Sequence, residues 1–227
     1  RDQEAALLDE LGEQGGQLSA ARTQAAAQLR AAVERELGYL SMERAQFLIQ
    51  ITQAPDPEGL AFNQGRWRFD ATGADQVEFL IAPNPGEEPK PLAKIASGGE
   101  TSRLMLAMKT ALSAIDPVPT LIFDEIDAGI GGRTGTIVGQ KLWSLARTHQ
   151  VSCVTHLAQI AAYGSQHFRV AKEIVDGRTV SSARTLAYPE RVEELAVMLG
   201  GTATEAARRN AEELLRRTAE QATLAER

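Results

Sequence analysis

The spacing of apolar residues divides the chain of 227 residues into an amino-terminal helical arm and a body of mixed pattern. Between residues 17 and 40, apolar residues recur every three or four positions, which predicts a helix with one narrow apolar stripe. Residues 1–11 have a similar character, but glycines near residues 12–16 interrupt it. We interpret residues 1–40 as a coiled-coil arm with a glycine-rich break near residues 12–16. A surface helix packed on its own body is the alternative.

Residues 41–227 alternate between strand and helix patterns, which predicts an α/β fold. The run TLIFD at residues 120–124 is continuously apolar, as in strands that are buried on both faces of a sheet. A helix over about residues 133–149 and the strand QVSCVTH follow it. The other predicted elements are strands over AQFLIQITQ and QVEFLIAP with a Pro/Gly interruption at APDPEG between them, a helix over about residues 100–115, a short helix over LAQIAAY, a hairpin around Asp176 and Gly177, and a charged amphipathic helix at the end.

Composition and charge narrow the functions that this fold can carry. The chain is 43% hydrophobic and 24% charged, as expected of a soluble globular protein, and no apolar run is long enough to cross a bilayer. Its net charge of -6 excludes the broadly basic surface that grips duplex DNA, so any nucleic-acid contact has to be local. A single cysteine, Cys153, rules out an internal disulfide and favours a cytoplasmic location; we expect it to be a buried strand residue. Four arginines of the last helix are predicted to form a solvated face: Arg208, Arg209, Arg216 and Arg217.

One helix start carries a motif with two interpretations. Ser97 and Glu100 have the S-x-x-E spacing of a capping box, in which the two side chains satisfy unpaired backbone N–H groups. A capping box does not require Gly98 and Gly99, and a glycine within a helix costs on the order of 1 kcal/mol relative to alanine. Backbone N–H groups at a helix N-terminus attract phosphate. The motif therefore predicts either a cap alone or a cap that also binds phosphate.

Two carboxylates and a histidine are predicted to meet at one edge of the sheet. Asp124 and Glu125 end the run TLIFDE, and His156 follows the next strand along the chain. A strand, a helix and a strand with a connection of this length form a parallel pair, whose carboxyl ends lie at the same edge. Adjacent carboxylates are costly to bury there unless they meet a cation, a proton donor or water. A metal-nucleotide site is one solution, and a solvated turn is the other.

The order of these motifs resembles that of ABC-type ATPases. SGGE before a helix is similar to their signature loop, TLIFDE to their Walker B strand, the small-residue turn after it to their D-loop, and the histidine after the next strand to their switch histidine. The longer segments resemble the carboxyl-terminal half of the RecN family of SMC-like bacterial DNA-repair proteins; they are QVEFLIAPNPGEEPKPLAKIASGGETSRLMLAMK, FDEIDAGIGG, VTHLAQIAAYGSQHFRVAKE and RVEELAVMLGG. This resemblance implies that residues 41–227 form the carboxyl-terminal lobe of an ABC-type ATPase head, with a mostly parallel sheet flanked by helices, and that residues 1–40 are the returning coiled-coil arm.

The same resemblance implies roles for individual residues. Asp124 would bind Mg²⁺, Glu125 would activate water, and His156 would sense the γ-phosphate of ATP. The signature loop would bind an ATP molecule that is held mainly by a second head, through Ser97, Gly98, Gly99 and Glu100. An ATP-dependent homodimer of heads is therefore implied.

Three features leave questions open. Related D-loops carry an aspartate seven residues after the first Walker B acid, where this chain has Gly131, which leaves Asp127 as a possible substitute. Arg103 could contact nucleotide or pair with an acid. The phosphate-binding pattern G-x-x-x-x-G-K-[ST] does not occur in the sequence, and in SMC-like proteins it precedes the coiled coil. We therefore expect a composite site, completed by the amino-terminal half of the same polypeptide and by a second copy of the head.

Two classes of function follow. The first is the ATP-binding and hydrolysing head of a nucleoid-associated protein that binds DNA, mainly through its full length, during double-strand-break repair and recombination, without membrane contact. The alternative is an interaction module whose coiled coil and last helix dimerise while the ATPase motifs are vestigial. A transporter nucleotide-binding domain is disfavoured, because such a domain is not interrupted by a coiled coil.

Overall fold

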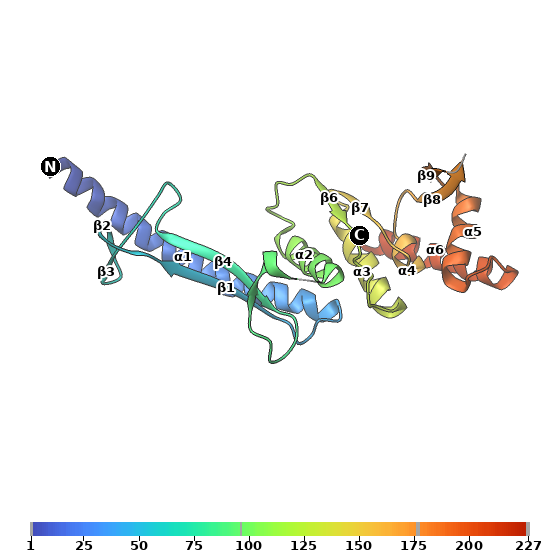
Figure 1. Ribbon diagram of the computed structural model, residues 1–227, viewed down its shortest axis with the longest axis horizontal. Coiled ribbons are helices and arrows are strands. Elements are labelled where there is room, and N and C mark those ends of the chain that lie inside the picture. The colour runs from blue at the N-terminus through green and yellow to red at the C-terminus, as the bar shows by residue number, and fades with distance from the viewer. Residues whose placement is uncertain (1, 96, 176–177, 226–227) are drawn as a thin grey trace. The chain divides into compact units, whose positions relative to one another are not determined.

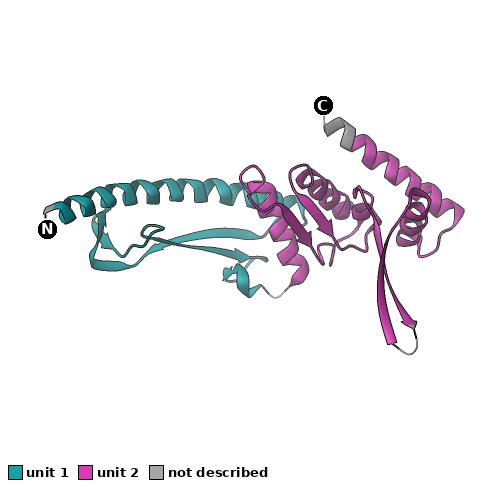
Figure 2. Cartoon of the chain, turned by 90° about the horizontal axis from the view of Figure 1, so that it is seen from above, with its two compact units in different colours: residues 1–96 teal, residues 97–227 magenta. Residues whose placement is uncertain are grey.

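A computed structural model describes residues 2–95, 97–175 and 178–225, and the chain divides into two compact units (Figures 1 and 2). The first unit comprises residues 1–96 and the second comprises residues 97–227. This division does not coincide with the boundary at residue 40 that we inferred between an arm and a head. The reason is that the amino-terminal helix packs on strands that follow it within the first unit.

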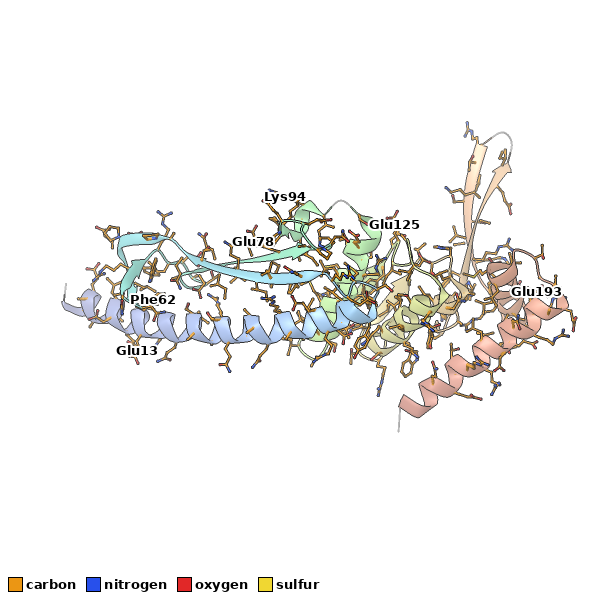
Figure 3. All side chains as sticks on the ribbon, turned by 90° about the horizontal axis from the view of Figure 1, so that it is seen from below. Glu13, Phe62, Glu78, Lys94, Glu125 and Glu193 are labelled. Atoms are coloured by element: carbon orange, nitrogen blue, oxygen red, sulfur yellow. The ribbon has the colours of Figure 1, made fainter. Side chains whose placement is uncertain are left out.

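Helix α1 (Asp2–Tyr39) spans the predicted arm without interruption. The predicted break near residues 12–16 is absent, because the glycines serve close packing instead. A Cβ atom on Gly12 would lie 2.7 Å from the carbonyl oxygen of Ala61, and one on Gly16 would lie 3.2 Å from Cβ of Phe62. Figure 3 shows Phe62 beside the helix. Small residues on α1 thus let strand β2 approach the helix backbone.

The strands of the first unit are antiparallel. Strands β1 (Gln46–Gln53), β4 (Asp75–Ala82) and β5 (Lys90–Pro91) form one sheet in the order β1-β4-β5, and β2 (Pro55–Phe62) pairs with β3 (Gly65–Trp67). A short 3-10 helix, η1 (Leu92–Lys94), follows. The two strands predicted in this region are confirmed as β1 and β4. The segment APDPEG belongs to strand β2, although we predicted an interruption there; its ladder with β3 is irregular between Pro55 and Leu60, where prolines are tolerated.

The second unit contains the alternation of helix and strand that the sequence predicted, and the α/β class is confirmed. A parallel pair forms between β6 (Thr120–Phe123) and β7 (Gln150–Cys153), and β8 (Phe168–Val175) pairs with β9 (Arg178–Thr185) as an antiparallel hairpin. The turn of that hairpin at Asp176 and Gly177 lies outside the described residues. The helices are α2 (Gly98–Leu112), α3 (Gly132–Leu145), α4 (Ala158–Ala161), α5 (Tyr188–Gly200) and α6 (Glu205–Ala225). Among the described strands the parallel arrangement is confined to β6 and β7. The hairpins β2–β3 and β8–β9 are antiparallel because their turns are short, and β1 pairs antiparallel with β4 across a longer connection.

Strand β6 is buried on one face, whereas we predicted burial on both. Leu121 and Phe123 are buried, but Ile122 is 75% exposed. Val154, directly after β7, is 63% exposed. Within the described part of the second unit, no element covers these two side chains. The second unit by itself therefore leaves part of the apolar run exposed.

Helices α5 and α6 pack together with α4 around small residues and leucines, including Leu195 and Leu215. The interpretation of the α6 arginines as a solvated face is confirmed, because each of them pairs with a glutamate at the surface. The pairs are Arg208 with Glu193, Arg209 with Glu205, Arg216 with Glu213 and Glu220, and Arg217 with Glu213. None of the helices in the described ranges has the length and apolar character required to span a membrane.

Candidate functional site

The parallel register of β6 and β7 brings the predicted acids and histidine to the same edge of the sheet. Phe123 lies opposite Cys153, and the N–H of Val154 donates to the carbonyl of Phe123 at 2.9 Å. Both strands therefore end together, and the chain leaves β6 as Asp124-Glu125 and leaves β7 toward His156. The geometric expectation for this edge is confirmed.

The serine half of the predicted capping box is confirmed at the start of helix α2. Ser97 has extended backbone angles, and its hydroxyl oxygen accepts a hydrogen bond from the N–H of Glu100 at 3.4 Å. The hydroxyl of Thr101 donates to the carbonyl of Ser97 at 2.8 Å. Ser97 and Gly98 are exposed, whereas Gly99 is buried. Two of the residues predicted to bind nucleotide are thus accessible at the helix start, and Glu100 is half-buried.

The two glycines lie against the loop that follows β6. A Cβ atom on Gly98 would come within 2.0 Å of Oε2 of Glu125, whose side chain is labelled in Figure 3. A Cβ atom on Gly99 would lie 2.8 Å from Cβ of Ala128 and 3.1 Å from its carbonyl oxygen. Gly99 faces fixed atoms of Ala128 and requires glycine, whereas at Gly98 only the end of the flexible Glu125 side chain would have to move. The structure therefore places the start of the SGGE helix beside the loop that carries the acidic pair, a contact that the sequence analysis did not predict.

Glu125 has an unusual backbone conformation. Its φ angle of 55° lies in the left-handed region, which is uncommon for a residue with a side chain and occurs at sites where the surroundings hold the strain. Its N–H donates to Oδ1 of Asp124 at 2.9 Å, and its carbonyl accepts from the N–H of Ala128 at 3.0 Å. These bonds close a tight turn that leaves both acidic residues exposed.

Arg103 ties helix α2 to the same loop. Its buried guanidinium donates to the carbonyl of Ala128 at 2.8 Å and lies 3.5 Å from that of Ile126. Burial lowers the pKa of Arg103, and the charge of Glu100 opposes that effect. The hydroxyl of Ser102 also donates to the carbonyl of Asp124 at 2.5 Å. Of the two roles considered for Arg103, the structure favours neither, because its partners are backbone carbonyls.

Asp127 is the central residue of this edge, and sequence reasoning missed its role. It is 4% exposed, and its Oδ2 accepts from the hydroxyl of Thr155 and from the N–H groups of His156 at 2.7 Å and Leu157 at 3.3 Å. Burial alone would raise the pKa of Asp127, but the hydrogen bonds from Thr155 and His156 outweigh it and lower the pKa below its ordinary value. The signal in the sequence was the aspartate three residues after Asp124, combined with the Thr-His pair after β7.

His156 combines an anchored nitrogen with an exposed ring. Its Nδ1 lies 3.0 Å from Oδ2 of Asp127, while the side chain as a whole is 71% exposed. A carboxylate at Nδ1 fixes the orientation of the imidazole and leaves Nε2 for a further partner. Nearby Cys153 is half-buried, and burial, followed by the charges of Asp127 and Asp124, raises the pKa of its thiol to about 12. Cys153 is thus a strand residue, as predicted, but it is half-buried rather than buried, and its raised pKa disfavours the thiolate at neutral pH.

The acids suit a metal ion that is held mostly by phosphate. Within the described residues, no three His, Cys, Asp or Glu side chains come together to hold a metal by themselves. Mg²⁺ commonly takes only one or two carboxylates in addition to phosphate and water. Asp124 is exposed and uses one carboxylate oxygen for the Glu125 N–H, which leaves the other oxygen for a cation.

A capped glycine-rich helix start, two acids after a strand and a histidine after the parallel neighbour thus occur in the order that the sequence analysis compared with the motifs of ABC-type ATPases. The particular relatives are RecN proteins. The chain is 46% identical to "DNA repair protein RecN" of Streptomyces coelicolor over 211 residues, which cover 92% of this chain and 37% of that protein. It is 48% identical to RecN of Xylella fastidiosa (strain 9a5c) over 184 residues, which cover 81% of this chain and 31% of that protein. The chain is thus homologous to RecN over nearly all of its own length, and it spans less than half the length of these relatives.

Two further comparisons complete this picture. No protein-family model matches the sequence. Among solved structures, the chain is similar to an SMC head domain with an extended coiled coil from Pyrococcus furiosus, at 20% identity and a TM-score of 0.46, over 75% of this chain and 37% of that one. That likeness is too distant to bear on function.

Proposed function

We propose that this chain is the carboxyl-terminal half of an SMC-like ATPase head that acts in DNA double-strand-break repair and recombination. The observation that carries the proposal is the shared edge at which the α2 start, Asp124, Glu125 and His156 meet. The homology to proteins named for DNA repair supports the biological setting. The protein that contains this chain would work in the cytoplasm at the nucleoid, and its full length would bind DNA.

Each residue at this edge would have a separate role in ATP hydrolysis. Mg²⁺ bound with ATP would supply charge neutralisation at the phosphates. Asp124 would hold that ion through its available carboxylate oxygen. Glu125 would orient and deprotonate the attacking water, since it is exposed and held in a strained turn. His156 would contact the γ-phosphate through Nε2.

The signature residues would act on a nucleotide that a second copy of the head presents. Ser97 and Gly98 are accessible at the N-terminus of α2, where backbone N–H groups and the helix dipole favour an anion. Gly99 and Glu100 would contribute by holding this start against the loop after β6, because Gly99 is buried on Ala128. ATP would thereby link two heads.

The intact protein and the 227-residue chain should differ in turnover. The sequence holds no G-x-x-x-x-G-K-[ST] loop, so the 227-residue chain should hydrolyse ATP negligibly, while the longer protein that contains it should show turnover and ATP-dependent association. Steady-state phosphate release and light scattering with and without ATP measure both properties. Equal turnover by the two proteins would contradict the composite site.

The amino-terminal half of the same polypeptide would cover the exposed face of the β6–β7 sheet. Ile122 and Val154 present an apolar surface beside the acidic edge. Apolar residues of the hairpin β8–β9 are exposed as well: Phe168, Val170 and Ile174. Faces of this kind mark protein contacts in soluble proteins.

Changing this face should therefore affect the longer protein. Ile122→Lys would place a charge in the contact and should lower its stability by about 2 kcal/mol or more. Ile115→Lys is the matched control, because Ile115 is 76% exposed in the loop after α2 and should tolerate the charge. Thermal unfolding of the two variants measures the difference; equal melting temperatures would remove this face from the contact.

The coiled-coil assignment of residues 1–40 belongs to the same proposal. Leucines on α1 remain exposed at Leu7, Leu11 and Leu18, which lie four and seven residues apart and can meet a second helix. The same leucines would serve the alternative function, an interaction module with vestigial ATPase motifs. Glu125 would be the general base in an ATPase head and would have no catalytic role in an interaction module. The Glu125→Gln variant therefore distinguishes the two functions.

A further inference from the structure

We propose that Asp127 is a positioning residue for His156, and that it sets the direction in which the imidazole presents Nε2. The inference rests on the proposed function of this edge and adds a positioning role for Asp127. It also replaces the idea that Asp127 substitutes for a D-loop aspartate that reaches a second head.

A single carboxylate oxygen of Asp127 holds three consecutive residues after β7. Oδ2 accepts from the hydroxyl of Thr155 and from the N–H groups of His156 and Leu157, and it lies 3.0 Å from Nδ1 of His156. The hydroxyl of Thr155 also accepts from the N–H of Leu157 at 3.0 Å. The oxygen that accepts the His156 backbone N–H is thus also the atom next to which Nδ1 of the ring lies, so one carboxylate positions both the backbone and the ring.

The ring contact has a chemical consequence. An ionised carboxylate next to Nδ1 favours hydrogen on that nitrogen, so Nε2 is the nitrogen that faces outward. Nε2 can donate to a phosphate oxygen when both ring nitrogens carry hydrogen. Without the carboxylate, the ring could turn and present the other nitrogen. Asp127 therefore determines which nitrogen faces a ligand.

The burial of Asp127 argues against a role across a head interface. The side chain is 5% exposed, and its bonded oxygen is occupied by groups of its own chain. Burying a carboxylate costs desolvation free energy, so a buried, paired carboxylate is weak evidence for added stability. Its contacts here serve to orient the segment after β7. A residue that reached a second head would have to leave these partners unsatisfied.

The loop that carries Asp127 is itself held in place. Arg103 donates to the carbonyl of Ala128 and lies near that of Ile126, the residues on either side of Asp127. Arg103 belongs to α2, whose first turn carries Ser97 and Gly98. His156 is thus connected, through Asp127 and Arg103, to the helix α2 that begins at the proposed phosphate contact.

The test is a double-mutant cycle in the longer protein that contains this chain. Asp127→Asn and His156→Gln should each lower kcat by about 10- to 100-fold, as loss of an orienting contact does elsewhere. The double variant should be no slower than His156→Gln alone, because Asp127 acts through that ring. Losses that multiply in the double variant would overturn the inference and leave Asp127 a purely structural residue.

Asp116→Asn is the matched control. Asp116 is also a buried, paired aspartate of the second unit, bonded to Lys109 at 2.6 Å at the other end of the strands. Its loss should lower the melting temperature with kcat unchanged. If Asp127→Asn does not fold, Thr155→Val removes one donor to the same carboxylate and should reproduce a smaller loss of kcat that also vanishes in the His156→Gln background.

A readout without turnover separates this inference from the proposed function. In protein labelled with ¹⁵N-histidine, His156, identified by the signal missing in His156→Gln, should show a protonated Nδ1 that changes in Asp127→Asn and persists in Asp116→Asn. An unchanged ring signal in Asp127→Asn would overturn the positioning role. If hydrolysis proves independent of Glu125 while the ring signal changes as expected, the ATPase proposal fails and the positioning role stands.

Discussion

Glu125→Gln in the intact protein should reduce ATP hydrolysis by about 10²- to 10⁴-fold, the usual loss when a general base is removed. The amide keeps the size of the side chain and can fill the space beside Gly98, so the turn after β6 should persist. ATP binding and ATP-driven association should remain, since neither needs the proton to be taken from water. Single-turnover hydrolysis and nucleotide-dependent association, measured on the same preparation, check both parts.

This substitution separates the two functions considered for the chain. An ATPase head loses turnover and keeps its nucleotide-linked dimer. An interaction module with vestigial motifs shows the same residual rate before and after the change. Glu78→Gln is a suitable control, because Glu78 is an exposed glutamate on strand β4 in the first unit and should leave turnover unchanged.

Gly98→Ala should lower kcat by about 10²-fold while the protein stays folded. The added Cβ would lie 2.0 Å from Oε2 of Glu125, so the carboxylate has to move. Displacement of a catalytic group by about 1 Å can cost about 10²-fold in rate. Because the obstructed atom is the end of a flexible side chain, and alanine suits a helix better than glycine, stability should change little.

The matched control for Gly98→Ala is Gly38→Ala. Gly38 also lies in a helix, α1, and a Cβ atom there would meet no atom within 4 Å. Both variants should have melting temperatures near that of the unmodified protein, and only Gly98→Ala should be slow. A fully active Gly98→Ala protein would mean that the observed closeness of Gly98 and Glu125 has no part in the reaction.

The elements that could be predicted are those whose signal is local. Strands β1, β4, β6 and β7 and helices α2, α3 and α6 follow from hydrophobic period and from turn residues that lie within each segment. Strand β2 was missed because its prolines mark an interruption unless the irregular ladder with β3 is known. The break predicted in α1 was wrong because glycine weakens an isolated helix, whereas here Gly12 and Gly16 allow contact with β2.

The part of the candidate site that depends on strand topology could be predicted from the sequence. The parallel rule for β6 and β7 was sufficient to put Asp124, Glu125 and His156 at one edge. It was not sufficient to show that Asp127 bonds the segment after β7, or that Arg103 holds the loop around it. These partners are 20 to 30 residues apart in the chain, and no local propensity links them.

The amino-acid sequence by itself determined the elements with a local pattern, the serine cap of α2 and the shared edge of β6 and β7, because these depend on spacing, capping chemistry and chain connectivity. Tertiary structure alone decided that Gly98 lies against Glu125, that Asp127 lies beside the His156 ring, and that Ile122 is left exposed. The physical reason is that close packing and burial are properties of surfaces brought together by folding. A pattern along one segment cannot specify which surface it will meet.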